Sequence, residues 1–515
     1  MSINSGRNIG GKRKHSRKRW LQVAKYVKIK LNEREARPLL FRQTGGLMKI
    51  TLIEPRAPGI HVYSKFKLPR LGLPILGALL QRELGIKPKI WVEDLSPIDF
   101  EDVLSSDLVG VSSLTPTSPR AYQLVERIKK QSSVLVVMGG PHVTFMPEEA
   151  LSRGADFVVR GEGEWAFLDL VRFLSTGLPP LETIANLSFR RGDKYYHNPG
   201  VQPQERLSEL PWPDLSLIQS WTKMRILPIM TSRGCPFNCT FCSVTKMFGR
   251  RYRMRAHEDV LAELEFWLKQ KKWRSVFFYD DNFAANPERT KGLLRQIIDR
   301  KLRMRWTAQV RVDVAQDEAL LSLMRASGCY VVYIGLESVN PKTLEKYRKR
   351  QTVDQIAAAI EAIHRHGINV HGMFVLGSDD DDRKTIDDTV RFARKLRIDT
   401  VQFMVLTPLP GTETFLELSR EGRLLEEDWS KFSGHHVVFK PKKISPYELQ
   451  KEAAIRAMRR FYSYWQAWKF GLQFRWRYFA LYSYARHAIK RWVGQNRDFL
   501  EKLRLLSQPT SRPIP

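Results

Sequence analysis

Cysteine is scarce in this sequence of 515 residues, which contains only four. Three of the four, Cys235, Cys239 and Cys242, occur within one short segment. Because a disulfide framework distributes its cysteines along the chain, this arrangement argues against a disulfide-stabilised secreted fold, and we expect no disulfide partner. Clustered thiols in a long chain instead indicate a metal or cluster site in a reducing compartment.

Long apolar runs are also missing from the sequence. No stretch approaches the roughly 18 apolar residues that a membrane-spanning helix requires. The first residues are polar and basic, and they do not form an apolar signal segment. We therefore expect a cytoplasmic protein that is at most peripheral at a membrane.

Acidic residues are outnumbered, since 54 Asp and Glu stand against 85 Lys and Arg, for a formal charge of +31. The excess is concentrated in the N-terminal arm and in the tail after Lys440, where basic residues mix with Trp, Tyr and Phe. This pattern favours an anionic membrane surface or nucleic acid as a partner, although simple solubility explains a basic chain equally well. A tail that packs as a lid on the preceding domain is the simplest interpretation.

Hydrophobic periodicity divides the chain into five parts. Residues 1–47 have no sustained period and indicate a disordered basic arm, and Met48, which opens the first strand, is a second candidate for the initiating methionine. Residues 48–180 alternate strand-like runs such as KITLIE and VLVVMGG with helix-like segments, which predicts an α/β domain with a parallel, Rossmann-like sheet. A Pro-rich linker is expected over 181–222.

A second series of alternating strands and helices occupies residues 223–440. Six strand-like runs, from RILPIMTS to TVQFMVLT, predict a partial (β/α)6 barrel of the TIM type, with its active site at the carboxyl ends of the strands. Residues 441–515 are basic and aromatic and predict a helical C-terminal extension.

The cysteine segment SRGCPFNCTFCSV spaces its thiols as C-x3-C-x2-C, directly after the first strand of the predicted barrel. Three thiolates on one short loop can converge on one face of an iron–sulfur cube, because cluster iron favours thiolate ligands. Three ligands for a four-iron cluster leave one iron open. Zinc is the alternative, but structural zinc is usually closed by four ligands, often as paired C-x2-C motifs, and the sequence has no second pair.

On this motif and its place in the barrel, the sequence resembles the radical S-adenosylmethionine (SAM) superfamily. The resemblance implies a [4Fe-4S] cluster whose open iron chelates the amino and carboxylate groups of SAM. One electron from a low-potential donor such as ferredoxin or flavodoxin then cleaves a sulfur–carbon bond and releases a 5′-deoxyadenosyl radical. Phe241, directly before Cys242, matches the aromatic residue that contacts adenine in the family, with ordinary loop packing as the alternative.

Further residues at the strand ends match the SAM contacts of the family. These residues lie in three segments, FFYDDNF, WTAQVRVD and YIGLESVN. In the first segment Asp280 directly precedes the two residues that match. Charged groups at the strand ends of a barrel face the site and not the core, although a structural ion pair is the alternative for each. The residues that the resemblance assigns to SAM are Asp281, Asn282, Gln309, Arg311, Glu337 and Ser338.

The fourth cysteine, Cys329, lies at the start of a predicted strand. A second catalytic thiol, as in some RNA-methylating relatives, is one interpretation. A small buried core residue is far more common, and we expect that role here.

The first α/β domain resembles the cobalamin-binding domain that precedes many radical SAM cores. The matching segments are IEPRAP, DLVGVSSLTPTSPRA, VVMGGPHVTFMPEEAL and ADFVVRGEGE. In such a domain, hydroxyl groups hydrogen-bond the nucleotide tail of the corrin and glycines permit close backbone approach. The residues that the resemblance assigns to cobalamin are Ser112, Ser113, Thr115, Gly139, Gly140, His142 and Gly161.

One departure from other cobalamin enzymes concerns the lower face of the corrin. The D-x-H-x-x-G motif, whose His ligates cobalt, is absent from residues 48–180, as it is from many radical SAM relatives. His142 is the nearest candidate, but stabilising a turn or touching the corrin edge suits it better. Glycines at such turns also occur in any nucleotide-binding fold and in a degenerate domain that binds nothing.

The resemblance implies a class B-type radical SAM methyltransferase. In that chemistry SAM methylates cob(I)alamin, a second SAM generates the radical, and the substrate radical takes the methyl group at an unactivated carbon. Oxidative cyclisation or rearrangement is the alternative, and a protein that binds nucleic acid or a membrane surface through its tail is a third. Methylthio transfer is excluded because it needs three further cysteines, and none precedes Cys235. The substrate, whether a small molecule, a lipid or a peptide, is left open.

Overall fold

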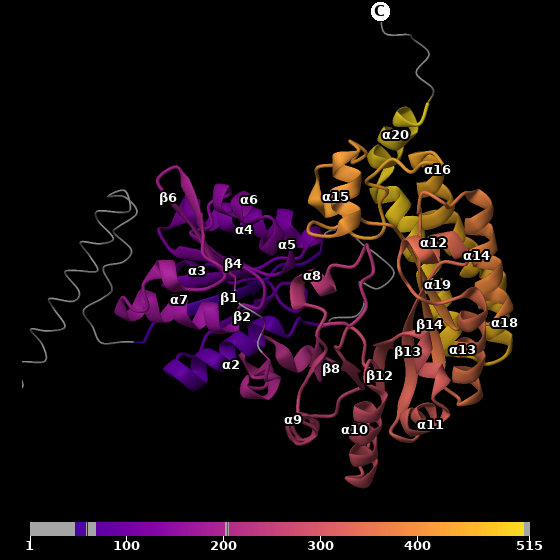
Figure 1. Ribbon diagram of the computed structural model, residues 1–515, viewed down its shortest axis with the longest axis horizontal. Coiled ribbons are helices and arrows are strands. Elements are labelled where there is room, and N and C mark those ends of the chain that lie inside the picture. Colours follow the sequence, from indigo (N-terminus) through magenta and orange to yellow (C-terminus); the bar gives the residue numbers. More distant parts are fainter. Residues whose placement is uncertain (1–46, 58, 60–67, 201–202, 204, 509–515) are drawn as a thin grey trace, which may run out of the picture.

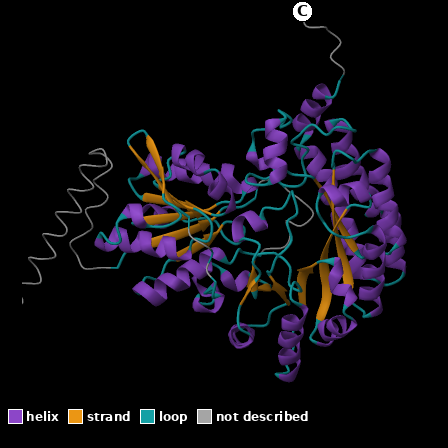
Figure 2. Ribbon diagram, in the orientation of Figure 1, coloured by secondary structure: helices purple, strands orange, loops and turns teal. Residues whose placement is uncertain are grey.

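The computed structural model describes residues 47–57, 59, 68–200, 203 and 205–508. The predicted basic arm lies outside the described residues, apart from Leu47. Figure 1 shows two α/β units side by side, with the C-terminal helices on the second unit. Figure 2 shows that the strands form two separate groups, each flanked by helices.

The N-terminal unit contains a seven-stranded sheet of order β2-β1-β3-β4-β5-β6-β7. The strands β1 to β5 are parallel, which confirms the Rossmann-like prediction. Their order, 2-1-3-4-5, is a doubly wound order that reverses between β1 and β3, where such folds bind ligands. The five parallel strands are β1 (Ile50–Glu54), β2 (Lys89–Val92), β3 (Leu108–Ser112), β4 (Leu135–Gly139) and β5 (Phe157–Val159).

Helices cover both faces of this sheet. The helices α2 and α7 lie on one face, where their buried residues join the larger hydrophobic core, and the others enclose a separate small core on the other face. The six helices are α2 (Gly72–Leu84), α3 (Phe100–Leu104), α4 (Ser118–Gln131), α5 (Pro141–Phe145), α6 (Pro147–Ser152) and α7 (Glu164–Thr176).

The segment expected as an irregular linker over 181–222 is in part a continuation of the first sheet. Its strands β6 (Leu187–Arg191) and β7 (Lys194–His197) form a hairpin, and β6 pairs antiparallel with β5. The prediction was wrong for this hairpin because its apolar run is short; Gly192, with a positive φ of 56°, closes the turn between the two strands. After β7 the described residues contain only isolated 3-10 turns up to Lys223, which suits a linker.

The second unit is built on a six-stranded sheet of order β15-β14-β13-β12-β11-β8. All neighbouring strands are parallel, and the first and last strands do not pair, so the predicted partial (β/α)6 barrel is confirmed. A short antiparallel pair, β9 with β10, flanks the segment that carries the three cysteines. The strands are β8 (Ile226–Ile229), β9 (Ser232–Arg233), β10 (Arg253–Met254), β11 (Ser275–Phe278), β12 (Trp306–Val310), β13 (Cys329–Glu337), β14 (Asn369–Leu376) and β15 (Thr400–Val405).

Helices follow these strands and form the outer layer of the barrel. Amphipathic periodicity gives them one buried face, as in α13, where Thr352 caps the N-terminus. The helices are α8 (Val244–Phe248), α9 (His257–Gln270), α10 (Pro287–Asp299), α11 (Glu318–Ala326), α12 (Pro341–Lys346), α13 (Val353–Arg365), α14 (Arg383–Lys395) and α15 (Glu413–Arg420).

The C-terminal extension is helical, as predicted. It packs on the barrel through Tyr462, whose hydroxyl bonds both backbone groups of Val401 in β15. Among the described residues, no helix combines the length and the apolarity needed to cross a bilayer. The helices are α16 (Pro446–Leu449), α17 (Met458–Phe461), α18 (Tyr464–Leu472), α19 (Trp476–Gln495) and α20 (Arg497–Leu506), with π-helical turns over Gln450–Ala457.

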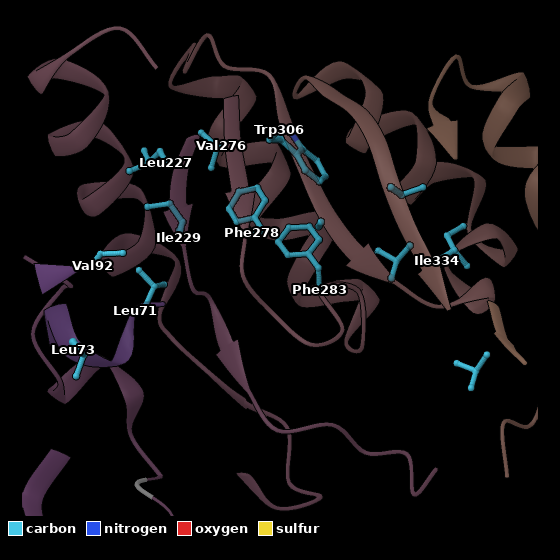
Figure 3. Close-up of a cluster of buried hydrophobic side chains, with 14 of the residues drawn as sticks. Leu71, Leu73, Val92, Leu227, Ile229, Val276, Phe278, Phe283, Trp306 and Ile334 are labelled. Atoms are coloured by element: carbon cyan, nitrogen blue, oxygen red, sulfur yellow. The ribbon is translucent and has the colours of Figure 1, made fainter. Parts of the chain in front are cut away.

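One hydrophobic core continues from the first unit into the second. Figure 3 shows Leu71 and Val92 of the N-terminal unit near Ile229 of β8, with Phe278 and Trp306 farther along the same cluster. Since apolar burial is the main driving force of folding, this shared core holds the two units together.

Candidate active site between the two sheets

The carboxyl ends of the two parallel sheets face each other. Gly411, after β15, packs on the Phe145 ring of α5 so closely that a Cβ atom would lie 2.4 Å from it. The rings of His142 and Trp429 are also in contact, with centroids 5.1 Å apart. Because ligands bind beyond the carboxyl ends of parallel strands, one space between the units serves both predicted cofactor sites.

A cavity of about 640 Å³ occupies the barrel interior and reaches the N-terminal unit. Its wall is aromatic and polar, with few charges. From the N-terminal unit it includes Ala57, Leu68 and Pro116. From the barrel it includes Phe277, Tyr279, Thr307, Gln309, Tyr330, Tyr333, Met373 and Gln402. From the C-terminal part it includes Lys431, His435, His436, Trp492, Gln495 and Asn496.

The cysteine loop begins directly after β9. Gly234 has a positive φ of 84°, and a Cβ atom there would lie 2.3 Å from the carbonyl oxygen of Arg251, so only glycine fits. Within the loop, the Cys242 amide donates to the Cys239 carbonyl at 3.2 Å. The Thr240 hydroxyl donates to the Lys346 carbonyl at 3.3 Å and the Thr414 amide donates to the Thr240 carbonyl at 3.2 Å, so the loop contacts the segments that follow β13 and β15.

The three loop cysteines are free thiols of intermediate exposure. Burial raises the pKa of Cys235, and it raises the pKa of Cys242 to about 12, with smaller contributions from the neighbouring thiols and Asp281. Thiolates at these positions therefore need a cationic partner, which cluster iron supplies. No three His, Cys, Asp or Glu side chains of the described chain surround one point as for a single metal ion, and thiolates that bind separate irons do not need to.

Asp280 is a structural anchor for the start of this loop. Its carboxylate accepts hydrogen bonds from the Thr231 amide at 3.2 Å, from the Thr231 hydroxyl at 3.0 Å and from Ser232. The carboxylate is buried and so ties the end of β11 to the strand pair that carries the cysteine loop.

Asp281 and Asn282 lie at the end of β11, as predicted. The Asp281 carboxyl is reached by solvent but enclosed by protein, and desolvation, with a smaller effect of Asp280, raises its pKa to about 7. Asn282 is buried, yet neither its amide nitrogen nor its oxygen has a hydrogen-bond partner. A buried unpaired amide is costly unless a ligand satisfies it, so Asn282 fits a polar ligand such as SAM.

Gln309 and Arg311 follow each other along β12 and its end. Gln309 lines the cavity, and its amide lies 3.5 Å from the Asp280 carbonyl. Arg311 stacks on the Phe237 ring of the cysteine loop, 3.6 Å from the centroid, and donates to the Lys349 carbonyl at 2.6 Å. Arg311 therefore fixes the cysteine loop; its buried Nε has no hydrogen-bond partner and lies 3.7 Å from the Asp313 carboxylate.

Glu337 forms a buried ion pair with Lys349, at 2.6 Å, which sequence reasoning missed. A Cβ atom on Gly335 would lie 2.5 Å from the Glu337 carboxylate, so the glycine of YIGLES makes room for this pair. Ser338 is buried, and its hydroxyl accepts from the Asn340 amide at 3.0 Å, which stabilises a turn.

Phe241 and Cys329, for each of which a functional and a structural role were considered, lie in different surroundings. The Phe241 ring packs on Tyr347 with centroids 4.8 Å apart and stays partly exposed beside Cys242, in the place predicted for the adenine contact. Cys329 is fully buried in β13 and belongs to the hydrophobic core, as expected.

The end of β3 carries the strongest candidates for cobalamin. The Ser112 hydroxyl oxygen is buried without a hydrogen-bond partner, at the point where the strand order reverses. Ser113 is buried, and its amide donates to the Gly139 carbonyl at 2.8 Å. Gly140 has a positive φ of 105°, and a Cβ atom would lie 2.7 Å from the Ser113 carbonyl oxygen. The unpaired Ser112 hydroxyl can hydrogen-bond a ligand, and the glycine backbone beside it has no side chain that would keep a large ligand at a distance.

The remaining predicted cobalamin contacts lie around this edge. Thr115 is buried at the start of a 3-10 turn, next to the cavity residue Pro116. The Gly161 amide donates to the Thr144 hydroxyl at 2.9 Å, and space is open around its Cα. The structure does not bring His142 to the cavity, because its buried ring bonds the Tyr122 hydroxyl at 3.1 Å, so it stabilises the turn after β4.

A buried ion-pair network joins the two units and was not predicted. Arg233 of β9 pairs with Glu164 at 2.6 Å and with Glu162 at 3.2 Å, and Arg253 also pairs with Glu162. Burial raises the pKa of Glu164, but the Arg233 guanidinium outweighs it and holds that pKa below its usual value. The GEGE segment after β5 was the available signal, since carboxylates there face the second unit.

The lid interpretation of the tail is confirmed for the C-terminal part of α19. Trp492, Gln495 and Asn496 line the cavity, and Asn496 bonds the His436 imidazole at 2.9 Å. Burial lowers the pKa of His436 to about 4, so the ring is neutral at physiological pH. The tail therefore closes part of the cavity.

Comparison with known proteins agrees with this geometry. Residues 229–393 match the model of the radical SAM superfamily, and residues 60–171 match that of the B12 binding domain. An uncharacterized methyltransferase of Pyrococcus horikoshii is 34% identical over 417 residues, which cover 79% of this chain and 90% of the relative. The bacteriochlorophyllide d C-12(1)-methyltransferase of Chlorobaculum tepidum is 30% identical, over 68% of this chain and 73% of the relative.

Among solved structures, the cobalamin-dependent SAM radical enzyme OxsB with aqua-cobalamin bound matches with a TM-score of 0.69 and 16% identity, over 92% of this chain and 81% of that chain. At this identity the likeness is one of fold. The residues at both sheet edges fit the groups that the two family models imply, which are a [4Fe-4S] cluster with SAM and cobalamin. The chain belongs to the cobalamin-binding radical SAM methyltransferase family.

Proposed function

We propose that this enzyme transfers a methyl group to an unactivated carbon of a small molecule or lipid with an apolar body. The observation that carries the proposal is that Pro116, next to the cobalamin edge, and Gln309, next to the SAM edge, line the same cavity. A substrate in that cavity is within reach of both cofactors at once, which methyl transfer between them requires.

The wall of the cavity supports the choice of substrate. Phe277 and Tyr279, from β11 and its end, and Tyr333, from β13, contribute aromatic rings, and Met373 adds an adaptable apolar surface. The tyrosine hydroxyls and Gln402 offer a few hydrogen bonds for orientation. Such a wall suits an apolar molecule with a small number of polar groups better than a charged peptide.

When bound, the cluster supplies an electron for cleavage of SAM, and cobalamin supplies the methyl group. Side chains from both units hold these groups. Cys235, Cys239 and Cys242 hold the cluster, the Asn282 amide binds SAM, and Ser112 bonds the corrin tail. Asp281, with its pKa of about 7, can take up or release a proton at its carboxyl oxygen beside the cluster loop near neutral pH.

We further propose a cytoplasmic location and a low-potential protein donor such as ferredoxin or flavodoxin. Support comes from four free cysteines, which suit a reducing compartment. The surface beside the cysteine loop includes exposed Arg250 and Arg251, which suit an acidic electron carrier. Reduced flavodoxin that sustains turnover without dithionite supports this part of the proposal.

The test is anaerobic reconstitution with iron, sulfide and hydroxocobalamin, followed by incubation with a low-potential reductant (dithionite or reduced flavodoxin), SAM that carries a CD3 methyl group, and a lipid and pigment extract. We expect 5′-deoxyadenosine, S-adenosylhomocysteine and a CD3-labelled product in equal amounts. Deoxyadenosine with an unlabelled, oxidised product identifies a cyclase or rearrangement enzyme instead. Absence of deoxyadenosine overturns radical chemistry altogether.

A further inference from the structure

The helices α18 and α19 form a hairpin whose inner side is firmly attached to the barrel. Ala467 and Phe470 of α18 are buried, and the Phe470 ring packs on Tyr478 and Tyr482 of α19 with centroids 5.2 and 5.1 Å apart. The Tyr478 hydroxyl donates to Asp399, in the loop before β15, at 3.0 Å. These contacts bury the inner apolar face of the hairpin, so the outer side chains are not needed to attach the hairpin to the barrel.

The outer side of the same hairpin is also apolar. Phe474, at the turn between the helices, is 80% exposed, and Trp465 is 67% exposed. The exposed side chains touch one another, since Trp465 packs on Trp468 at 5.3 Å and Trp476 lies 6.0 Å from Phe479. The whole exposed set is Tyr464, Trp465, Trp468, Leu472, Phe474, Trp476 and Phe479. A contiguous patch of this kind is rare on a protein surface that meets only water, so it marks an interaction surface.

The charged residues of the hairpin itself have one sign. From residue 453 to residue 497 the sequence has ten Lys and Arg and no Asp or Glu. Lys469 and Arg477 are exposed on the hairpin, and neither forms an ion pair with another described residue. Figure 1 shows α18 at the outer edge of the barrel, on the side away from the N-terminal unit. The patch is therefore accessible, and the charged side chains on its own helices are all basic.

We propose that the tip of this hairpin docks on the surface of an anionic lipid bilayer. Tryptophan, tyrosine and phenylalanine next to Arg and Lys are the side chains that favour the headgroup region, where the rings insert and the cations meet lipid phosphates. Phe474, at the turn between the helices, is the most exposed of these side chains. Single-stranded nucleic acid is held by rings on which bases stack, whereas this set also exposes the aliphatic Leu472, which cannot stack but can insert among acyl chains, so the composition favours a bilayer over nucleic acid.

The placement has a consequence for the whole enzyme. The helix α19 begins within the exposed patch at Trp476 and ends at Gln495, which lines the cavity. A single rigid element thus joins the docking surface to the cavity wall. The proposal concerns the docking surface alone and stands whatever the reaction in the cavity is.

The test is flotation of the full-length holoenzyme with vesicles of phosphatidylcholine, with and without phosphatidylglycerol. We expect flotation only with the anionic lipid, a blue shift of tryptophan fluorescence, and loss of binding as salt rises. The variant W465S/F474S/W476S and the variant K469E/R477E should each reduce the bound fraction by about tenfold or more. The basic arm is the same in all variants, so only the difference from the wild type counts.

Matched controls use exposed residues of the same kinds elsewhere. W165S/F266S and K272E should float as the wild type does, because Trp165, Phe266 and Lys272 are exposed outside the hairpin. Equal flotation of the wild type with both vesicles, or full flotation of the triple variant, overturns the proposal. It is also overturned if the triple variant loses only RNA retention, or only self-association measured by sedimentation, with vesicle binding unchanged.

Discussion

The two sheet edges that meet at the cavity are built in different ways. In the N-terminal unit the edge consists of small residues, with the Ser112 hydroxyl unpaired and Gly140 against the Ser113 backbone. In the barrel it consists of thiols, carboxylates and the unpaired Asn282 amide. We therefore propose that a large corrin is held by space and close backbone approach, whereas a cluster with SAM is held by specific ligands. The two edges should respond to mutation in different ways.

The largest effect should come from the barrel edge. We expect Cys239→Ala to reduce 5′-deoxyadenosine formation to the background level, because the two thiolates that remain are too few to hold the cluster. Corrin binding should be unchanged, as measured by absorbance after gel filtration. Cys329→Ala is the matched control, since Cys329 lies in the core of β13 and should leave the cluster intact. Wild-type cluster absorbance in Cys239→Ala contradicts the assignment.

The reciprocal change is made at the N-terminal edge. Gly140→Ala introduces a Cβ atom 2.7 Å from the Ser113 carbonyl oxygen at a positive φ. We expect loss of most bound corrin with deoxyadenosine formation retained, measured side by side in one preparation. Gly192→Ala, where no atom lies within 4 Å of the added Cβ, is the control for the strain of a positive φ alone. Retained corrin in Gly140→Ala shows that the edge does not hold the cofactor.

A third change removes an ion pair from the buried network that joins the two units. Arg233→Met leaves the buried Glu164 carboxylate unpaired, which should lower the free energy of unfolding by about 3–5 kcal/mol. Urea denaturation followed by tryptophan fluorescence measures the effect. Arg206→Met is the control, because its pair with Glu209 is exposed and should be worth about 1 kcal/mol or less. Similar losses in the two variants are inconsistent with a buried network.

A fourth change tests whether the unpaired Asn282 amide hydrogen-bonds a ligand. Asn282→Leu should weaken SAM binding to the cluster-loaded enzyme by about 1–3 kcal/mol, as measured by calorimetry. Without SAM, the same variant should be as stable as the wild type or more so, because it removes a buried unpaired polar group. A variant that is destabilised and binds SAM normally shows a purely structural role.

The smallest effect concerns the lid, which belongs to neither edge. The folded protein keeps His436 neutral down to about pH 4, whereas the unfolded chain protonates this residue below about pH 6.5. The unfolded state thus binds more protons in this window, so stability falls as pH decreases from 6.5 toward 4, by about 1 kcal/mol per pH unit. His436→Gln should flatten this slope in denaturation measured between pH 7 and pH 5, and exposed His487→Gln should not.

Sequence periodicity was sufficient for most of the fold. Strands such as KITLIE and SVFFYDD were identifiable because buried parallel strands are continuous apolar runs between helical segments. The hairpin of β6 and β7 was missed because its run is short and its neighbour β5 lies far back in the chain. The three cysteines were identifiable from spacing alone, since ligands on one loop need no tertiary information.

Other parts of the site were not predictable. Lys349 and Glu337 are twelve residues apart in sequence, and they meet because the chain turns back through α12 after β13, while Gly335 leaves room for the pair. The same holds for Glu164 and Arg233, which come from different units. For His142 the sequence left a turn role and a contact with the corrin edge both open, and packing against Trp429 and Tyr122 encloses the ring, which agrees with the turn role.

Local sequence patterns were enough to predict the two α/β units, their order and the candidate thiol ligands, because periodicity and loop spacing are local properties of the chain. The folded structure was needed to show which residues pair across the units, which polar groups remain unsatisfied beside the cavity, and which face of the tail covers the barrel. These outcomes depend on long-range packing, in which burial of a charge or an amide is tolerated only where a distant partner or a ligand meets it.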